Sequence, residues 1–440
     1  LLEAEGVKKI YVLGPEPDKY PSTVQWAKNT IVWHRDKLEE AHEILRDTEG
    51  VTALIYDQEC AANLRRKRRR GQVEEPAMTV FINEAVCEGC GDCGVKSNCL
   101  SVQPVETEFG RKTQIHQSSC NKDFSCLDGN CPAFMTIVPG DIPVKKAKPF
   151  YKVEHEIPEP ENKIQGSANI YMMGIGGTGV VTTNQIVATA AMLDGKHVTS
   201  LDQTGLSQKG GPVVSNLKIT GQALDESNLI AIGQADAYLV FDVLTGTAPK
   251  NLGRANPERT VAIVSMSEVP TGSMVSNTDV HFPDAGRLSG MINERTLSDR
   301  NIFFDATGLA ETLFDNHMAA NLIVIGAAYQ SGLLPVRAEA LEEAIKLNGV
   351  KVEMNLNAFS AGRLAVADPQ WVATIDISRS GALDTVKDEK HASHPLIKWI
   401  ETSSELHRLM AIRVPELIAY QNEAYAKEYV DFVQKVYEKE

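Results

Sequence analysis

Seven of the eight cysteines lie between residues 87 and 131, and this cluster constrains the chain more than any other feature. The run begins Cys87-x2-Cys90-x2-Cys93, with interleaved glycines that let the backbone turn tightly. Three thiolates at this spacing bind corners of a [4Fe–4S] cubane, whereas zinc sites usually combine two separated Cys-x2-Cys pairs. Disulfide scaffolds are typical of short secreted chains, not of 440 residues with one dense cluster. The spacing therefore favours an iron–sulfur cluster.

The fourth ligand of this cluster is expected from farther along the chain. In two-cluster ferredoxins, the last ligand of one cluster comes from the other cysteine run and precedes a proline. Cys131 is followed by Pro132 and fits this role. The spacing predicts a first [4Fe–4S] cluster held by Cys87, Cys90, Cys93 and Cys131.

The second cysteine run is less regular. Cys120 and Cys126 flank Asp123, which stands where a third cysteine would be, and Cys99 is the candidate fourth ligand. A carboxylate is a harder and weaker ligand for this iron than a thiolate. We therefore predict a [4Fe–4S] cluster with a labile iron bound to Asp123, or a [3Fe–4S] cluster. The alternative is a degenerate run that binds nothing.

Composition and charge narrow the function classes. Lys and Arg total 44 against 58 Asp and Glu, a formal charge of −14 that argues against general nucleic-acid binding. The basic run at 65–71 is interpreted as a solvated linker, with a nucleic-acid signal as the alternative. No apolar run reaches the roughly 18 residues of a membrane span, and the first residues of the sequence do not have the pattern of a signal peptide. Clustered thiols without a signal peptide indicate a reducing cytoplasm.

Residues 1–57 predict a small β-α-β unit. Apolar strands are expected at 8–14 and 51–57, around a helix within 35–47. This core is too small to stand alone, so the unit is expected to be the tail of a larger α/β domain. The first residue is not methionine, which agrees with a piece of a longer polypeptide. Cys60 is expected to be a buried structural thiol.

From residue 167 onwards, strands alternate with helical segments, which predicts a mainly parallel sheet covered by helices. Residues 358–363 are expected to form a strand edge. The chain is expected to end in a helix pair, with Pro395 opening the first segment and a break or kink at Pro415. The expected strands are 169–174, 197–202, 213–219, 237–242, 260–265 and 301–306.

A glycine turn follows the first of these strands. Gly174, Gly176 and Gly179 match the dinucleotide-binding fingerprint, with Gly177 as an extra glycine, and Asp202 lies near the place of its acid. Such glycines let a backbone approach a phosphate at a helix N-terminus. They also serve strand–helix packing with no ligand, so phosphate contact remains one of two interpretations.

The loop that follows weakens the dehydrogenase interpretation. Residues 203–211 are polar and glycine-rich where a dehydrogenase would normally continue through a helix. Thr204 and Lys209 are the candidate contact residues, and Lys209 beside two glycines suggests an anion site or an interdomain contact. The alternative is an exposed turn.

Four segments carry a family resemblance. The segment "VFINEAVCEGCGDCGVKSNCL" resembles the ferredoxin segment of the fused bacterial indolepyruvate ferredoxin oxidoreductases, in the 2-oxoacid:ferredoxin oxidoreductase superfamily. "MGIGGTGVVTTNQIVATAAML" resembles the start of the gamma domain of that superfamily, and "NLIVIGAAYQSGLLP" its later part. "TALIYDQECAANLRRKRRRG" resembles the end of the thiamine-diphosphate-binding domain.

The resemblance implies an α/β chain of several parts, in the order found in the family. The expected parts are the tail of the thiamine-binding domain with the basic linker (1–75), a two-cluster ferredoxin-like α+β domain (76–145), a linker (146–166), the mainly parallel gamma domain (167–390) and a helical extension (391–440).

The resemblance also implies a reaction. Family members oxidatively decarboxylate aryl-type 2-oxoacids to acyl-CoA and pass the electrons to ferredoxin, with thiamine diphosphate, Mg²⁺ and coenzyme A taking part. The implied partners are ferredoxin, the remaining thiamine-binding domains and further copies of the chain. The diphosphate-binding Gly-Asp-Gly motif is missing from these residues, so we expect the electron-transfer and gamma portion of the enzyme. The rival hypotheses are an NAD(P)-linked oxidoreductase with an attached ferredoxin module and a non-enzymatic electron carrier.

Overall fold

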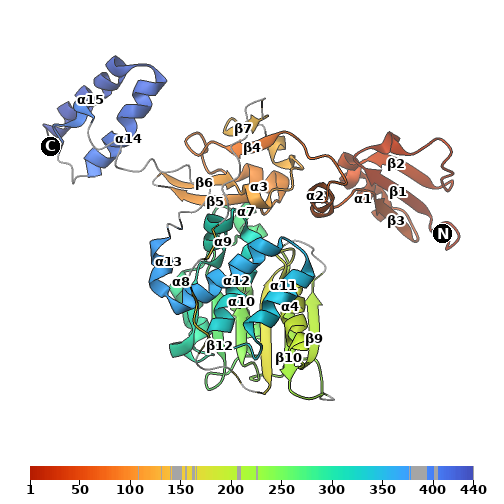
Figure 1. Cartoon of the computed structure of the whole chain (residues 1–440). Helices are drawn as coiled ribbons and strands as arrows, with labels where there is room; N and C mark the ends of the chain where they lie inside the picture. Colours follow the sequence, from red (N-terminus) through yellow and green to blue (C-terminus); the bar gives the residue numbers. More distant parts are fainter. Residues whose placement is uncertain are drawn as a thin grey trace.

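The described residues of the chain form four β-sheets in a computed structural model, and Figure 1 shows how these parts are arranged. The model describes residues 1–107, 109–129, 131–138, 140, 151–153, 156–160, 164, 166–205, 210–223, 226–375, 377, 394–400 and 405–439.

The N-terminal unit is a parallel three-stranded sheet in the order β2-β1-β3. Tyr11 and Leu13 of the central strand are buried against Ala41 of the helix, and these residues form a small core of their own. The predicted strand–helix–strand pattern is found, but the edge strand β2 was not predicted. The elements are β1 (Lys9–Gly14), η1 (Pro17–Lys19), β2 (Thr30–His34), η2 (Arg35–Lys37), α1 (Leu38–Arg46) and β3 (Thr52–Tyr56).

The basic run at 65–71, which was interpreted as a solvated linker, is mostly helical. It lies largely within the helix α2 (Ala61–Arg69), which joins the N-terminal sheet to the cysteine-bearing part of the chain. Arg65 and Arg68 are partly buried and hydrogen-bonded to backbone carbonyls, so the solvated-linker interpretation is wrong for them. Cys60 precedes the helix and is exposed, which contradicts its expected burial.

The cysteine-bearing part is a small α+β unit, called the cysteine module below. Two antiparallel strand pairs, β4 with β7 and β5 with β6, frame its loops. Two short helical segments, α3 and η4, pack against each other between them. The elements are β4 (Thr79–Ile82), α3 (Asp92–Ser97), β5 (Val102–Thr107), β6 (Gly110–Ile115), η3 (Gln117–Ser119), η4 (Ser125–Gly129) and β7 (Phe134–Ile137).

A mixed six-stranded sheet forms the largest domain, in the order β13-β12-β11-β8-β10-β9. Every strand of this sheet except β10 runs in the same direction, so the prediction of a mainly parallel sheet is confirmed. The six strands match the predicted segments: β8 (Ala168–Ile175), β9 (His197–Thr204), β10 (Pro212–Thr220), β11 (Ala237–Val240), β12 (Val261–Ser265) and β13 (Ile302–Phe304).

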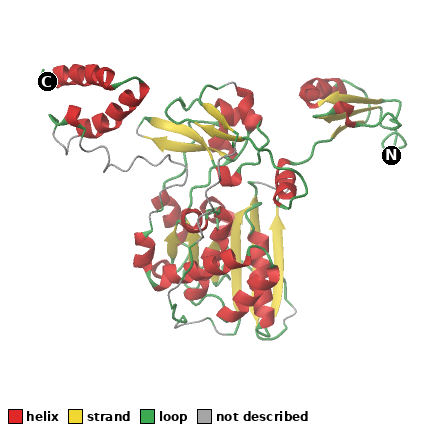
Figure 2. Ribbon diagram, turned by 45° about the horizontal axis from the view of Figure 1, so that its top comes forward, coloured by secondary structure: helices red, strands yellow, loops and turns green. Residues whose placement is uncertain are grey.

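Helices cover both faces of this sheet, as Figure 2 shows. The larger core lies under α4 (Val180–Leu193), α9 (Ala306–Phe314), α10 (Ala320–Gln330), α11 (Ala338–Asn348) and α12 (Val352–Ala367). The smaller core lies under α5 (Val243–Gly246), α6 (Pro249–Leu252) and α8 (Ala285–Asn293). The remaining segments are α7 (Gly272–Ser276), η5 (Ser298–Arg300), η6 (His317–Ala319) and α13 (Pro369–Thr374).

The segment 358–363 lies inside α12, so the predicted strand edge is wrong. Its small residues serve a close contact between two helices. A Cβ on Gly362 would stand 1.9 Å from the carbonyl oxygen of Ile323 in α10, and one on Gly326 would stand 2.0 Å from that of Phe359. Helix packing therefore explains the small side chains.

The described residues of the expected linker are packed rather than extended. Tyr151 donates its backbone N–H to Leu313, and Ile164 donates to Gly332, both in the α/β domain. Glu159 pairs with Arg363 at 3.0 Å. These contacts extend the core that α9, α10 and α12 cover.

The C-terminal segment is a helical pair, as expected. Pro395 opens η8 (Pro395–Ile397), and α14 (Glu405–Tyr420) packs against α15 (Glu423–Tyr437) around an apolar core. The chain turns before α15 at Asn422, while Pro415 lies inside α14, so the predicted break is misplaced. None of the described helices is long and apolar enough to cross a lipid bilayer.

Candidate iron–sulfur site

The first cysteine run turns tightly between β4 and α3. Gly89 and Gly91 both have left-handed backbones, with φ of +70° and +80°. The N–H of Gly89 donates to the Sγ atom of Cys87 at 3.4 Å. A Cβ on Gly89 would stand 2.1 Å from the carbonyl oxygen of Arg111, so this position excludes a side chain.

The structure brings the first predicted ligand set together. Cys87 and Cys93 are buried, and Cys131 is partly buried. Burial is the main cause that raises the pKa of the Cys93 thiol to about 11, and the negative charges of Cys87, Cys90 and Cys131 contribute to this rise. Mutual electrostatic influence of this kind requires the four sulfur atoms to be neighbours.

The second run repeats the backbone conformation of the first. Lys122 and Phe124 have φ of +50° and +61°, and they stand two and four residues after Cys120, just as the two glycines follow the first cysteine of the first run. The N–H of Lys122 donates to the Sγ atom of Cys120 at 3.4 Å. The two runs therefore form the same turn, although only the first has glycines at the left-handed positions.

The second predicted ligand set is also brought together. Burial is the main cause that raises the pKa of the Cys126 thiol to about 12, and the negative charges of Cys120, Cys99 and Asp123 contribute to this rise. Asp123 is exposed, and its Oδ1 atom accepts a hydrogen bond from Ser125 at 3.3 Å.

Within the described residues, no three His, Cys, Asp or Glu side chains gather tightly enough to hold one metal ion. Two thiolate-rich sets, each with a backbone N–H directed at sulfur, fit iron–sulfur clusters better than zinc.

The cysteine module lies across the carboxyl ends of the parallel strands of the large sheet, as Figure 1 shows. Arg111 of β6 donates to the carbonyl oxygens of Thr278 at 2.7 Å, Val280 at 3.0 Å and Met274, all in the segment after β12. Val275 from this segment packs in the same apolar cluster as Cys87 and other residues of the module. The α/β domain thus supplies part of the wall around the first run.

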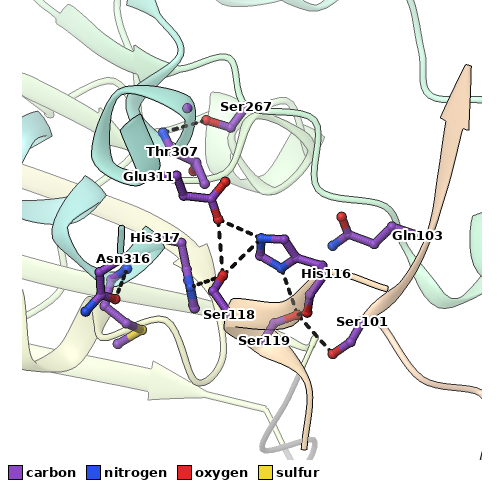
Figure 3. A network of polar contacts seen from close by, with 12 residues as sticks. Ser101, Gln103, His116, Ser118, Ser119, Ser267, Thr307, Glu311, Asn316 and His317 are labelled. Atoms are coloured by element: carbon purple, nitrogen blue, oxygen red, sulfur yellow. Dashed lines mark hydrogen bonds and ion pairs between the residues drawn. The ribbon is translucent and has the colours of Figure 1, made fainter. Parts of the chain in front are cut away.

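A polar network forms a second contact between the two parts (Figure 3). The Nε2 atom of His116 lies 2.6 Å from the Oε1 atom of Glu311 in α9. Ser118 donates to the same oxygen at 3.2 Å, and its Oγ atom lies 3.0 Å from the Nδ1 atom of His317. The His116 and Glu311 side chains are only 16% and 13% exposed, so water weakens this contact little.

The glycine turn after β8 uses its glycines mainly for packing. A Cβ on Gly174 would stand 2.9 Å from Val180 and 3.0 Å from Phe241. Gly176 donates its N–H to Gly211 at 2.6 Å, so this donor is already used within the loop.

The other candidate contact residues lie nearby or outside the described residues. Gly177 is exposed with φ of +88°, and Gly179 precedes α4 with φ of +95°. Thr204 is exposed at the end of β9. Lys209 lies outside the described residues. The adjacent Gly210 approaches the cysteine module, because a Cβ there would stand 2.5 Å from Leu100.

Asp202 does not stand where a dinucleotide-binding fold needs its acid. In that fold, the acid ends a strand directly beside the glycine-bearing strand, but here β10 lies between β8 and β9. The Oδ1 atom of Asp202 accepts hydrogen bonds from Asn184 at 2.9 Å and Ser215 at 2.5 Å. The strand order therefore argues against the NAD(P)-linked alternative.

The described structure thus combines an α/β domain with a cysteine module docked on it. Residues 169–365 match the family model "Pyruvate ferredoxin/flavodoxin oxidoreductase". These residues therefore belong to the predicted 2-oxoacid:ferredoxin oxidoreductase superfamily, and the relatives that they match are named as oxidoreductase subunits, which supports the prediction that the chain is part of such an enzyme.

The matching relatives are subunits of such enzymes. The chain is 29% identical over 203 residues to the indolepyruvate oxidoreductase subunit IorB of Methanothermobacter thermautotrophicus, covering 46% of this chain and 98% of the relative. It is 28% identical over 196 residues to IorB of Archaeoglobus fulgidus, covering 44% and 92%. Among solved structures, the gamma subunit of a keto/oxoacid ferredoxin oxidoreductase from Geobacter sulfurreducens matches with 23% identity and a TM-score of 0.32, over 45% of this chain and 98% of that one.

Proposed function

We propose that this chain is the electron-transfer and gamma portion of a thiamine-dependent oxidoreductase for aryl-type 2-oxoacids such as indolepyruvate. One 2-oxoacid anion, coenzyme A and two oxidised ferredoxins yield acyl-CoA, carbon dioxide, two singly reduced ferredoxins and one proton. Thiamine diphosphate and Mg²⁺ would be held by other domains. The named function of the IorB relatives supports the substrate class.

The observation that carries this proposal is the pair of ligand sets in a module docked on the superfamily domain. Cys87, Cys90, Cys93 and Cys131 would hold a [4Fe–4S] cluster, and Cys99, Cys120, Cys126 and Asp123 would hold a second [4Fe–4S] or a [3Fe–4S] cluster. When bound, such clusters accept and release single electrons.

The residues around the runs would orient and shield these groups. The N–H groups of Gly89 and Lys122 donate to ligand sulfur atoms, which stabilises thiolate over thiol. Val275 contributes apolar cover for the first set, and solvent exposure is one determinant of cluster potential. The backbone repeat in the second run supports a second cluster over a degenerate run, because non-glycine residues in left-handed conformations are costly without a function.

The proposed partners follow from the same reaction. Ferredoxin would accept the electrons, and the remaining thiamine-binding domains and further copies of the chain would complete the enzyme. The exposed loop at Gly177 and the segment around Thr204 and Lys209 would contact coenzyme A or a neighbouring domain. The contact of Gly210 with Leu100 favours the neighbouring domain. Clustered thiols and reduced clusters persist in a reducing compartment, so the cytoplasm is the proposed location.

Anaerobic reconstitution of the chain tests this proposal. We expect about eight irons and eight sulfides per chain, or about one iron fewer if the second cluster is [3Fe–4S]. Indolepyruvate with coenzyme A should reduce the clusters only after the thiamine-binding part is added. Bleaching by NAD(P)H alone would support the pyridine-nucleotide alternative, and reduction by neither would leave an electron carrier.

A further inference from the structure

The helix α2 contacts the second cysteine run through arginine side chains. Arg65 donates from its Nη1 atom to the carbonyl oxygen of Ser119 at 3.2 Å and from its Nη2 atom to that of Ser118. These two residues directly precede Cys120. A single guanidinium therefore binds two consecutive peptide groups on the N-terminal side of the first ligand of the second set.

Arg68 makes the matching contact on the other side of Cys120. Its Nη1 atom donates to the carbonyl oxygen of Asn121 at 2.8 Å and lies 3.4 Å from that of Lys122. Arg65 and Arg68 are three residues apart and so share one face of the helix. Together the two side chains hold the backbone from 118 to 122, which is the segment that presents Cys120.

This segment needs support that the first run does not. Lys122 and Phe124 have left-handed backbones without being glycine, which is unfavourable for residues with a Cβ atom. Such conformations persist only where the surroundings impose them. Arg68 binds the carbonyl oxygen of the same peptide group whose N–H Lys122 donates to Cys120, and also the carbonyl oxygen of the next peptide group.

The same arginines place fixed positive charge beside the second ligand set. The Nε atom of Arg68 is buried and has no hydrogen-bond partner within the described residues. A thiolate-ligated cluster is anionic and gains a further negative charge on reduction. A nearby guanidinium, which stays protonated at all relevant pH values, therefore stabilises the reduced form more than the oxidised form.

We propose that Arg65 and Arg68 form a cationic clamp that holds the second cysteine run in its cluster-binding conformation and raises the reduction potential of the cluster bound there. The clamp belongs to the segment that joins the N-terminal α/β unit to the cysteine module, so it ties the second site to that unit. This inference rests on the second cluster of the proposed function.

Redox titration of the full chain, followed by electron paramagnetic resonance, tests the clamp. In Arg68→Gln we expect the equilibrium constant for reduction of the second cluster to fall about tenfold. This corresponds to a reduction potential about 59 mV lower for a one-electron couple. The first cluster should be unchanged in the same titration. Arg68→Lys keeps the charge without the forked donor and should restore most of the potential.

Arg70→Gln is the matched control, because Arg70 is exposed and caps the C-terminal end of the same helix. It removes the same charge from the same helix and should leave the potential close to wild type. Amide exchange at Cys120 and Lys122 should be faster in Arg68→Gln than in Arg70→Gln.

The iron content separates the possible failures. If the chain holds about eight irons, and Arg68→Gln and Arg70→Gln have equal reduction potentials and equal amide exchange rates, the clamp is wrong. The second cluster would then still be supported by the iron content. About four irons in the wild-type chain would remove the second cluster, and the clamp with it, while the first cluster remained.

Discussion

Gly94 of the first cysteine run lies against the backbone of Val275 in the α/β domain. A Cβ on Gly94 would stand 2.1 Å from the carbonyl oxygen of Val275 and 3.1 Å from its Cγ1 atom. No real Cβ tolerates the first distance, so this glycine sets how closely the two parts can dock. This close docking places Val275 in the apolar cluster that surrounds Cys93.

Gly94→Ala should therefore push the cysteine module away from the sheet. We expect a loss of about 1–3 kcal/mol in the free energy of unfolding, typical of overpacking, together with greater sensitivity of the clusters to oxygen. Denaturant unfolding and the rate of cluster bleaching in air measure the two effects. Gly290→Ala is the control, since Gly290 lies in α8 with no atom near its Cβ position, and it should be neutral or slightly stabilising. Equal stability of the two variants would contradict the close docking.

The two ligand sets predict which thiols carry iron. Cys93→Ala should lower the iron content by about four per chain, and Cys126→Ala by about three or four according to the type of the second cluster, because each removes a ligand of a different set. Cys60→Ala should lose none, since Cys60 is exposed outside both sets. Iron and sulfide analysis after reconstitution measures this. Loss of all iron in Cys126→Ala would mean that the two sets are not independent.

Asp123→Cys should strengthen the second cluster. Thiolate is a softer and stronger ligand for this iron than carboxylate, so the variant should gain about one iron if the wild type holds [3Fe–4S]. Its oxidised-state [3Fe–4S] signal should disappear from the paramagnetic resonance spectrum. Asp123→Asn is the matched control and should keep that signal. A signal unchanged by Asp123→Cys would exclude position 123 as the site of the labile iron.

Asp242 lies just after β11 and caps the N-terminus of α5. We expect this buried carboxyl to make the stability of the protein depend on pH. Burial raises the pKa of this carboxyl, while its hydrogen bond from the N–H of Thr245 lowers it. A raised pKa in the folded state means that the associated stability is fully present below the unfolded pKa, about 3.9, and is lost as pH rises through the folded pKa.

Asp242→Asn keeps an oxygen that can accept from Thr245 but carries no charge. The variant should thus gain stability relative to the wild type as pH rises from about 4 towards 7, and the gain should vanish at lower pH. Denaturant unfolding at several pH values measures it. Asp242→Ala is the control that removes the helix cap and should lose about 1 kcal/mol. A constant difference between Asp242→Asn and the wild type at all pH values would contradict the raised pKa.

Much of the architecture could be predicted from local patterns. The six strands of the large sheet are short apolar runs, which can be recognised from their own residues without knowledge of the strands that they pair with. The strand β8, which is followed by a glycine turn, is a clear example. The edge strand β2 was missed because Thr30–His34 is only partly buried, so its pattern is weak. The segment 358–363 was misassigned because small residues are typical both of strands near a turn and of close helix contacts, as Gly362 shows.

By itself, the sequence determined the grouping of Cys87, Cys90 and Cys93, since ligand spacing is a local property of the chain. It also indicated that Asp123 replaces a cysteine. Only the tertiary structure decided the strand order that separates Asp202 from β8, and the role of the basic run, whose arginines bind carbonyls some 53 residues away. Such contacts depend on how distant segments pack. Every residue carries a backbone carbonyl, so the residue types do not indicate which carbonyl will accept a hydrogen bond from an arginine.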